Sequence, residues 1–236
     1  MKIRIKFAKE GNMKFIGHLD VMRYFQKVMR RADVDIRYSE GFSPHQIMSF
    51  AAPLGVGITS RGEYVDIEVL STDSSKEMLR RINGVSVEGM EVLSYKRLPD
   101  TAASAMSIVA ASDYRVTFRQ GKAPEDWEGF AAGLEAFADQ DRILVTKKTK
   151  KGEKETDIRP MIHSLSVDGQ AVRMRLATGS VANLKPEAVI RAYMDQAGLV
   201  LEDFALLVQR EEVYGSRGTG EGAELVALDA FGEEIG

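Results

Sequence analysis

Apolar and charged residues alternate at the start of the chain. The odd positions from Ile3 to Phe7 are apolar, and the even positions from Lys2 to Lys6 are charged. This period of two is typical of a β-strand with one face against a core and the other face in water. We therefore predict an amphipathic strand at residues 2–7.

A helical period follows within residues 18–34. Apolar side chains recur there every three or four residues, which is the spacing of one face of an α-helix. Basic side chains occupy much of the other surface, so the pattern predicts an amphipathic helix with a basic face. The basic residues are Arg23, Lys27, Arg30 and Arg31.

The next elements complete a set of four strands and two helices. Alternation and capping residues predict strands and helices in the order βαββαβ. After the first helix, the predicted segments are a strand at 35–38, a strand at 62–70, a helix at 74–82 and a strand at 89–96.

A similar order returns after a stretch of small residues. Its predicted segments are a strand at 114–118, a helix at 124–140, a strand at 142–148, a loop at 147–160, a hairpin at 164–176, a helix at 185–197 and a strand at 202–210. Two sets of βαββαβ predict an α+β protein with two tandem ferredoxin-like domains, each with an antiparallel sheet. The predicted boundaries are 1–98 for the first domain with a glycine-rich loop at 39–62, 99–112 for a linker, 113–214 for the second domain and 215–236 for an acidic C-terminal tail.

The ferredoxin-like order makes the first and third strands of each domain neighbours. The charged residues from Lys2 to Lys6 then lie near Tyr64, Asp66 and Glu68. Opposite charges on neighbouring strands attract, so we expect a ladder of cross-strand charge pairs. In the second domain, the outward-facing arginines lack an obvious acidic ladder and are better candidates for binding an anion. These are Arg115, Arg119, Arg173 and Arg175.

The composition excludes several kinds of site in this chain. The chain of 236 residues is 44% hydrophobic and contains no cysteine, which excludes disulfides, thiolate metal ligands and an iron–sulfur cluster held by this chain. No apolar run reaches the roughly 18 residues of a membrane span. We therefore expect a cytoplasmic protein with no membrane contact and no cofactor of its own.

Charge is distributed unevenly along the chain. Residues 1–50 carry ten Lys or Arg against five Asp or Glu, whereas residues 201–236 carry two against nine. The basic end would attract an anion such as RNA, and the acidic end would repel one; ordinary solvated surface is the alternative.

Residues 38–64 concentrate glycine and proline. They lack the lysine and the following helix of a phosphate-binding P-loop. In the βαββαβ order they form the long connection between the second and third strands, with an apolar part against the core. Ser43, His45 and Arg61 are the side chains that this segment would present beside the basic helix.

Two histidines are candidates for chemistry. His18 and Asp20 lie at the start of the first helix, and His45 lies in the glycine-rich loop. Histidines near a carboxylate can act as acid and base, so RNA cleavage without a metal is one interpretation and a structural hydrogen-bonding role is the other. We predict no metal site.

A lysine-rich stretch is either a phosphate clamp or a solvated hairpin tip. It contains Lys147, Lys148, Lys150, Lys151 and Lys154 and leads to Asp157 and Arg159.

Two blocks of the sequence resemble a known family. Residues 7–68 are similar to the N-terminal signature of the radical-SAM-linked proteins, and residues 154–162 are similar to a second block of that family. The resemblance implies a stand-alone partner of a radical SAM protein encoded nearby. The matching residues are Phe15, His18, Asp20, Arg23, Ser39, Glu40, Gly41, Phe42, Pro44, His45, Ser49, Pro53, Gly62, Glu63, Asp66, Asp157, Ile158 and Arg159.

A looser resemblance concerns fold alone. A first strand, a helix that begins HLD and a glycine-rich loop are also similar to the RNA-binding and RNA-cleaving repeat-associated proteins of CRISPR systems.

Three functional hypotheses follow. The preferred one is a non-catalytic module that binds structured RNA, such as tRNA or rRNA, or presents a substrate to a radical SAM enzyme for RNA modification. The alternatives are a metal-independent endoribonuclease that uses His18 or His45, and a protein-interaction adaptor. The recognition residues expected are Asp20, Arg23, Lys27, Ser39, Glu40, Gly41, Phe42, Ser43, Pro44, His45, Arg61, Lys147, Lys148, Lys150, Lys151, Asp157, Arg159, Arg173 and Arg175.

Overall fold

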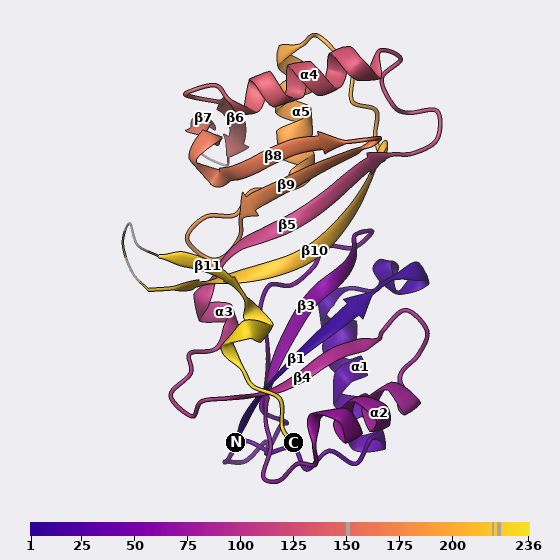
Figure 1. Ribbon diagram of the computed structural model, residues 1–236, viewed down its shortest axis with the longest axis vertical. Helices are drawn as coiled ribbons and strands as arrows, with labels where there is room; N and C mark the ends of the chain where they lie inside the picture. The colour runs from indigo at the N-terminus through magenta and orange to yellow at the C-terminus, as the bar shows by residue number, and fades with distance from the viewer. Residues whose placement is uncertain (150–151, 219, 221–222) are drawn as a thin grey trace. The chain divides into compact units, whose positions relative to one another are not determined.

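The structure is a computed structural model that describes residues 1–149, 152–218, 220 and 223–236. The chain divides into two compact units (Figure 1). Unit 1 contains Met1–Ala110 and Arg210–Gly236, and unit 2 contains Ala111–Gln209. Both combine antiparallel strands with helices, which confirms the predicted α+β class.

Unit 1 contains an antiparallel sheet in the order β4-β1-β3, with β2 and the later part of β10 also on β3. Helices α1 and α2 cover one face of the sheet (Figure 1). The elements are β1 (Lys2–Lys9), the 3-10 helix η1 (Gly11–Phe15), α1 (His18–Arg31), β2 (Met48–Phe50), β3 (Thr59–Glu68), α2 (Ser75–Val85), β4 (Val92–Leu98), α3 (Ala105–Ile108), β11 (Glu224–Ala227) and the 3-10 helix η4 (Leu228–Phe231).

Unit 2 contains the antiparallel order β5-β9-β8, with α4 and α5 packed on the sheet. β10 begins in unit 2 and continues into unit 1 from Arg210. The elements are β5 (Val109–Phe118), α4 (Trp127–Ala138), β6 (Leu144–Thr149), β7 (Gly152–Asp157), the 3-10 helix η2 (Arg159–Met161), β8 (Ile162–Asp168), β9 (Ala171–Ala177), α5 (Pro186–Gln196) and β10 (Leu206–Arg217).

The predicted pairing of the first strand with residues 62–70 is confirmed. Lys2 lies opposite Glu68, Arg4 opposite Asp66 and Lys6 opposite Tyr64. The expectation that this face is wet is wrong, because Arg4 and Tyr64 are buried. A second apolar cluster of Ala51, Tyr64, Ala105, Val213 and Leu228 lies on this side.

The end of the chain explains that burial. The sequence predicted an acidic tail at 215–236, but these residues include β11 and η4, and Leu228 is fully buried. β10 runs so close to β3 that a Cβ at Gly62 would lie 2.6 Å from the Cα of Glu212. Glycine at position 62 is therefore required for close approach of the two backbones.

Two predicted elements differ in detail. The predicted strand at 35–38 makes only isolated bridges, Ile36 with Val69 and Tyr38 with Gln46, while the regular strand β2 lies later. The predicted loop at 147–160 includes strand β7, which pairs with β6 in a separate two-stranded sheet.

Candidate functional site

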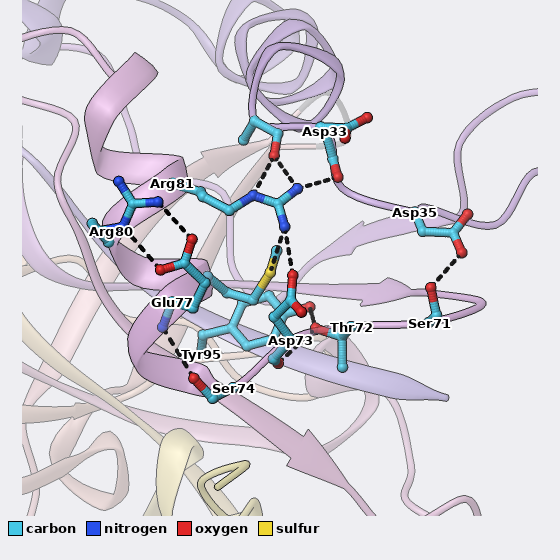
Figure 2. Close-up of polar contacts among 12 residues, drawn as sticks. Asp33, Asp35, Ser71, Thr72, Asp73, Ser74, Glu77, Arg80, Arg81 and Tyr95 are labelled. Carbon is cyan, nitrogen blue, oxygen red and sulfur yellow. Dashed lines mark hydrogen bonds and ion pairs between the residues drawn. The ribbon is translucent and has the colours of Figure 1, made fainter.

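Helix α1 is held at its C-terminal end by Arg81 of α2 (Figure 2). The Arg81 guanidinium donates hydrogen bonds to the carbonyl oxygens of Ala32 and Asp33 and to the Asp73 carboxylate. The carbonyls at the end of a helix have no partner within the helix, and a cation there also complements the helix dipole. Arg81 therefore fixes the direction of α1.

The buried face of α1 carries Val21, Phe25, Val28 and Met29. Its other face presents the cations expected from the sequence. Arg23 makes an exposed ion pair with Asp20 at 3.4 Å, and Arg30 donates to the carbonyl of Gln26. Lys27 and Arg31 are exposed, and no hydrogen bond or ion pair engages them within the described residues.

The segment at 38–46 lies against this helix. The Gln46 side-chain amide donates to the backbone carbonyl of Gln26 in α1 at 3.3 Å and to the hydroxyl of Tyr38 at 3.4 Å. The backbone NH of Ser39 bonds the carbonyl of His45 at 2.8 Å, which closes the segment into a loop. The loop is thereby attached to the middle of the basic helix.

Aromatic side chains project from this loop into solvent. Phe42 is completely exposed, and Tyr38 is 46% exposed. The His45 ring bonds the Ser39 hydroxyl at 2.9 Å. The other predicted recognition residues of the loop are Glu40, Gly41, Ser43 and Pro44, and all four are exposed. Aromatic and basic groups are thus combined on one part of unit 1.

A small pocket lies at the other end of α1. It is lined by residues of β1, α1, β3 and the segment after β2, including Lys9, His18, Phe50 and Glu63. Phe50 and Ala51 are buried, as predicted for the apolar part of the glycine-rich segment. The His18 ring meets the Phe50 ring edge to face, with 5.2 Å between centroids.

Two buried charged residues, Lys9 and Glu63, line this pocket, and Arg210 pairs with Glu63. Arg210 and Glu63 form a two-pronged ion pair with 2.8 Å between Nε and Oε1, and both side chains are at least 93% buried. Lys9 is 2% exposed. Burial lowers the pKa of Lys9, and Arg210 lowers it further, while Glu63 acts in the opposite direction.

Other predicted residues have local partners. Arg61 pairs with Glu10 at 3.0 Å and with Glu91 at 3.9 Å. Arg175 pairs with Asp113 at 2.7 Å, and Arg173 pairs with Asp168 at 3.1 Å. The expectation that the outward arginines of the second domain lack acidic partners is therefore wrong for Arg173 and Arg175.

Asp157 and Arg159 lie at the base of the β6-β7 hairpin. Asp157 accepts backbone hydrogen bonds from Ile143 and Arg159, which lower the pKa of its carboxyl group. Arg159 donates to the carbonyl of Ile162 at 2.9 Å. These contacts hold the two side chains against the local backbone. Lys147 and Lys148 lie on β6, and Lys150 and Lys151 lie outside the described residues.

The structure does not bring the two candidate histidines together. His18 lines the pocket and His45 bonds Ser39, and no contact between the two rings exists in the described part of the chain. No group of three acidic or histidine side chains able to hold a metal occurs among those residues.

Sequence reasoning missed Lys9, Glu63 and Arg210 as a buried charged group. The signal for Lys9 was present, because position 9 continues the inward odd-numbered positions 3, 5 and 7. The role of Arg210 had no local signal, since its partner Glu63 is 147 residues away.

Comparison with known proteins gives a family and distant likenesses to solved structures. No curated protein matches the sequence. Among solved structures, the chain is similar to one in a crystal structure of a Cbf5-Nop10-Gar1 complex, with 13% identity and a TM-score of 0.43. The match covers 89% of this chain and 48% of that chain, so this chain spans about half its length.

None of the helices in the described residues is long and apolar enough to cross a membrane. The family comparison covers most of the sequence, with a match over residues 2–186 to a family described as "Uncharacterized protein conserved in bacteria (DUF2344)". The chain therefore belongs to the DUF2344 family.

Proposed function

We propose that this protein is a non-catalytic cytoplasmic module that binds structured RNA, such as tRNA or rRNA, through α1 and the 38–46 loop. The observation that carries this proposal is the attachment of an exposed aromatic loop to the basic face of α1 through Gln46. The resemblance to radical-SAM-linked proteins adds a partner: the bound RNA would be presented to a radical SAM enzyme that modifies it.

The two parts of this surface have complementary chemistry. Lys27 and Arg31 are exposed cations suited to phosphates, because neutralising phosphates releases condensed counterions. Phe42 and Tyr38 offer exposed rings on which unpaired bases can stack. Unpaired bases beside a helical phosphate backbone are typical of structured RNA.

The same proposal includes a ferredoxin-like fold for each unit. Strand order β4-β1-β3 with β2 beside β3 supports a ferredoxin-like assignment for unit 1, and β5-β9-β8 supports the same assignment for unit 2. An endoribonuclease is less well supported, because His18 and His45 lie in different surroundings. Exposed Phe15, Leu19 and Val56 favour the protein-interaction adaptor as the second candidate.

The test is tRNA binding measured by filter retention over a salt series. We expect the Lys27→Gln/Arg31→Gln variant to bind more weakly, and the slope of log affinity against log salt to fall by about two. Phe42→Ala should weaken binding by about 1–3 kcal/mol with an unchanged slope, since stacking releases no counterions.

The matched control is Lys185→Gln/Arg191→Gln, which removes one lysine and one arginine from exposed positions around α5. An equal loss in this control would mean that only net charge matters. Failure of the wild type to bind tRNA at low salt would end the RNA proposal, and co-purification with a radical SAM protein in the absence of RNA would favour the adaptor.

A further inference from the structure

The sheet of unit 2 has one face covered by helices and one open face. Strands β10, β5, β9 and β8 lie side by side in that order, and α4 and α5 pack on one side of them (Figure 1). Alternate residues of each strand point to the other side. This open face carries exposed or half-buried side chains, which include Arg115 and Thr117 of β5, Arg119 directly after β5, Ser164 and Ser166 of β8, and Leu207 of β10.

Arg115 is a cation without a counter-charge on this face. It lies directly opposite Arg173 of β9, and like charges in that position repel each other. Asp168 pairs with Arg173 at 3.1 Å, whereas the Arg115 side chain makes no hydrogen bond or ion pair with the parts of the chain that the structure describes. The charge of Arg115 is therefore left for an anion from outside the chain.

Arg119 adds a second cation four residues further along. Its backbone NH donates to the carbonyl of Ala205 at 2.8 Å, and its Nε donates to the carbonyl of Phe204 at 2.8 Å. These bonds hold the guanidinium at the end of β5, and no carboxylate of the described ranges pairs with it. Residues four apart on a strand are separated by about 13 Å, so Arg115 and Arg119 can each meet a different anionic group of one extended chain.

Phe204 lies at the same end of the open face and is unusual in two ways. Its backbone has a φ of 58°, in the left-handed region that is costly for a residue with a bulky side chain. The residue is also 87% exposed, so its ring adds little to the core of unit 2. Strained residues cluster at binding sites, and an exposed ring next to the Arg119 guanidinium offers a stacking surface for a base close to a contact for its phosphate.

The rest of the open face is mostly polar. Thr117, Ser164 and Ser166 carry hydroxyl groups, which can both donate to and accept from the edges of bases. Leu207 is a large apolar side chain on this face and is 39% exposed. A protein partner would need an apolar centre to its interface, whereas interfaces with nucleic acids are more polar and more positively charged. The composition of the face therefore favours a nucleic acid over a protein.

We propose that the open face of unit 2 binds a single-stranded segment of RNA, with phosphates at Arg115 and Arg119 and an unpaired base on the ring of Phe204. The inference rests on the RNA-binding function proposed above and adds a second contact for the same class of ligand. A single strand is favoured over a duplex because a base has to be unpaired before it can stack on a side chain.

The test is NMR titration of the full chain with the single strand decauridylate and, separately, with an RNA duplex of similar length. We expect saturable shifts of the amides of Arg115, Arg119 and Phe204 with the single strand, and much weaker shifts with the duplex. Equal shifts with the duplex would contradict a single-stranded ligand, and unchanged amides at these positions would overturn the proposal.

The arginines are tested by Arg115→Gln/Arg119→Gln. We expect decauridylate to bind about tenfold more weakly, and the slope of log affinity against log salt to fall by about 1.4, since each phosphate of a single strand contributes about 0.7. The matched control is Arg142→Gln/Arg191→Gln, which removes the same charge from unit 2 before β6 and on α5. An equal loss in the control would leave net charge as the cause and sink the site.

Phe204→Asn separates a binding role of the ring from a structural one. Asparagine adopts a positive φ more readily than phenylalanine, so urea unfolding should show the variant to be at least as stable as the wild type. Its affinity for decauridylate should fall about fivefold or more with an unchanged salt slope, because the stacked base is lost. Unchanged affinity, or a loss of stability, would assign the ring to another role.

The same spectra report on α1, so the two RNA proposals can fail separately. Shifts at Lys27 and Arg31 without shifts at Arg115 and Arg119 would overturn the open-face site and leave the α1 site standing. Shifts at Arg115 and Arg119 alone would do the reverse. A hexaglutamate peptide that shifts the open-face amides as strongly as decauridylate would show a general anion surface and refute recognition of RNA there.

Discussion

Helix α1 in unit 1 and strand β9 in unit 2 both present basic residues that the sequence marked as anion-binding. On β9, Arg175 pairs with Asp113 through two hydrogen bonds of 2.7 and 2.9 Å, and Arg173 pairs with Asp168. On α1, Lys27 and Arg31 are exposed. The positive charge on β9 is therefore already balanced by neighbouring carboxylates, and we predict that it would attract a polyanion less strongly than the exposed cations of α1.

Arg4 is a cation that is both paired with a carboxylate and buried. Its guanidinium holds both oxygens of Asp66, at 2.7 and 2.9 Å, and donates to the carbonyls of Leu228 and Ala103. We expect Arg4→Met to reduce the free energy of unfolding by about 3–5 kcal/mol, because it leaves the Asp66 carboxylate without its cation. Urea unfolding measures this change.

The double variant Arg4→Met/Asp66→Asn is the control for this prediction. It removes both charges, so it should be markedly more stable than Arg4→Met alone. Equal stability of the two variants would show that lost packing, and not an unpaired carboxylate, sets the cost. tRNA affinity of the folded fraction should stay at the wild-type value in both.

The pairing behind Arg4 was predictable, but its burial was not. Alternation along residues 2–7 and 62–70 places Arg4 opposite Asp66 once the strand order is assumed. The cover on that face comes from Leu228 and Phe231, more than 200 residues away in the chain. Short-range patterns carry no information about contacts at such separation.

The candidate site was predictable to a similar extent. The basic face of α1 follows directly from its helical period, because the opposite face has to supply the core. The attachment of the 38–46 loop to α1 depends on one side chain, Gln46, whose partners no periodicity indicates. The balance of charge on β9 depends on Asp113 in another strand, and so it required the pairing of β5 with β9.

The anchoring of α1 gives a second prediction, of intermediate size. Arg81 is 22% exposed and donates to two carbonyls at the end of α1 as well as to Asp73 (Figure 2). Arg81→Met should lower the free energy of unfolding by about 1–3 kcal/mol, since the carbonyls lose their charged donor.

Hydrogen exchange locates this effect. Amides in the last turn of α1 should exchange faster in Arg81→Met, while amides of α5 in unit 2 should not change. The neighbouring Arg80→Met variant is the matched control, because Arg80 pairs with Glu77 in solvent and touches no helix end. Equal exchange in the two variants would exclude an anchoring role for Arg81.

The smallest effect comes from changing the charge balance on β9. Asp113→Asn removes the carboxylate that Arg175 binds while it keeps a side chain of the same shape. The pair is partly exposed, so the free energy of unfolding should change by no more than about 1 kcal/mol. If paired charge is what separates β9 from α1, this substitution should raise tRNA affinity slightly. The slope of log affinity against log salt should steepen by less than about one.

Filter retention at low salt measures the difference. The control for net charge is Asp139→Asn on the exposed end of α4. An identical gain in both variants would assign the effect to net charge alone, and the contrast between α1 and β9 would then lose its physical basis.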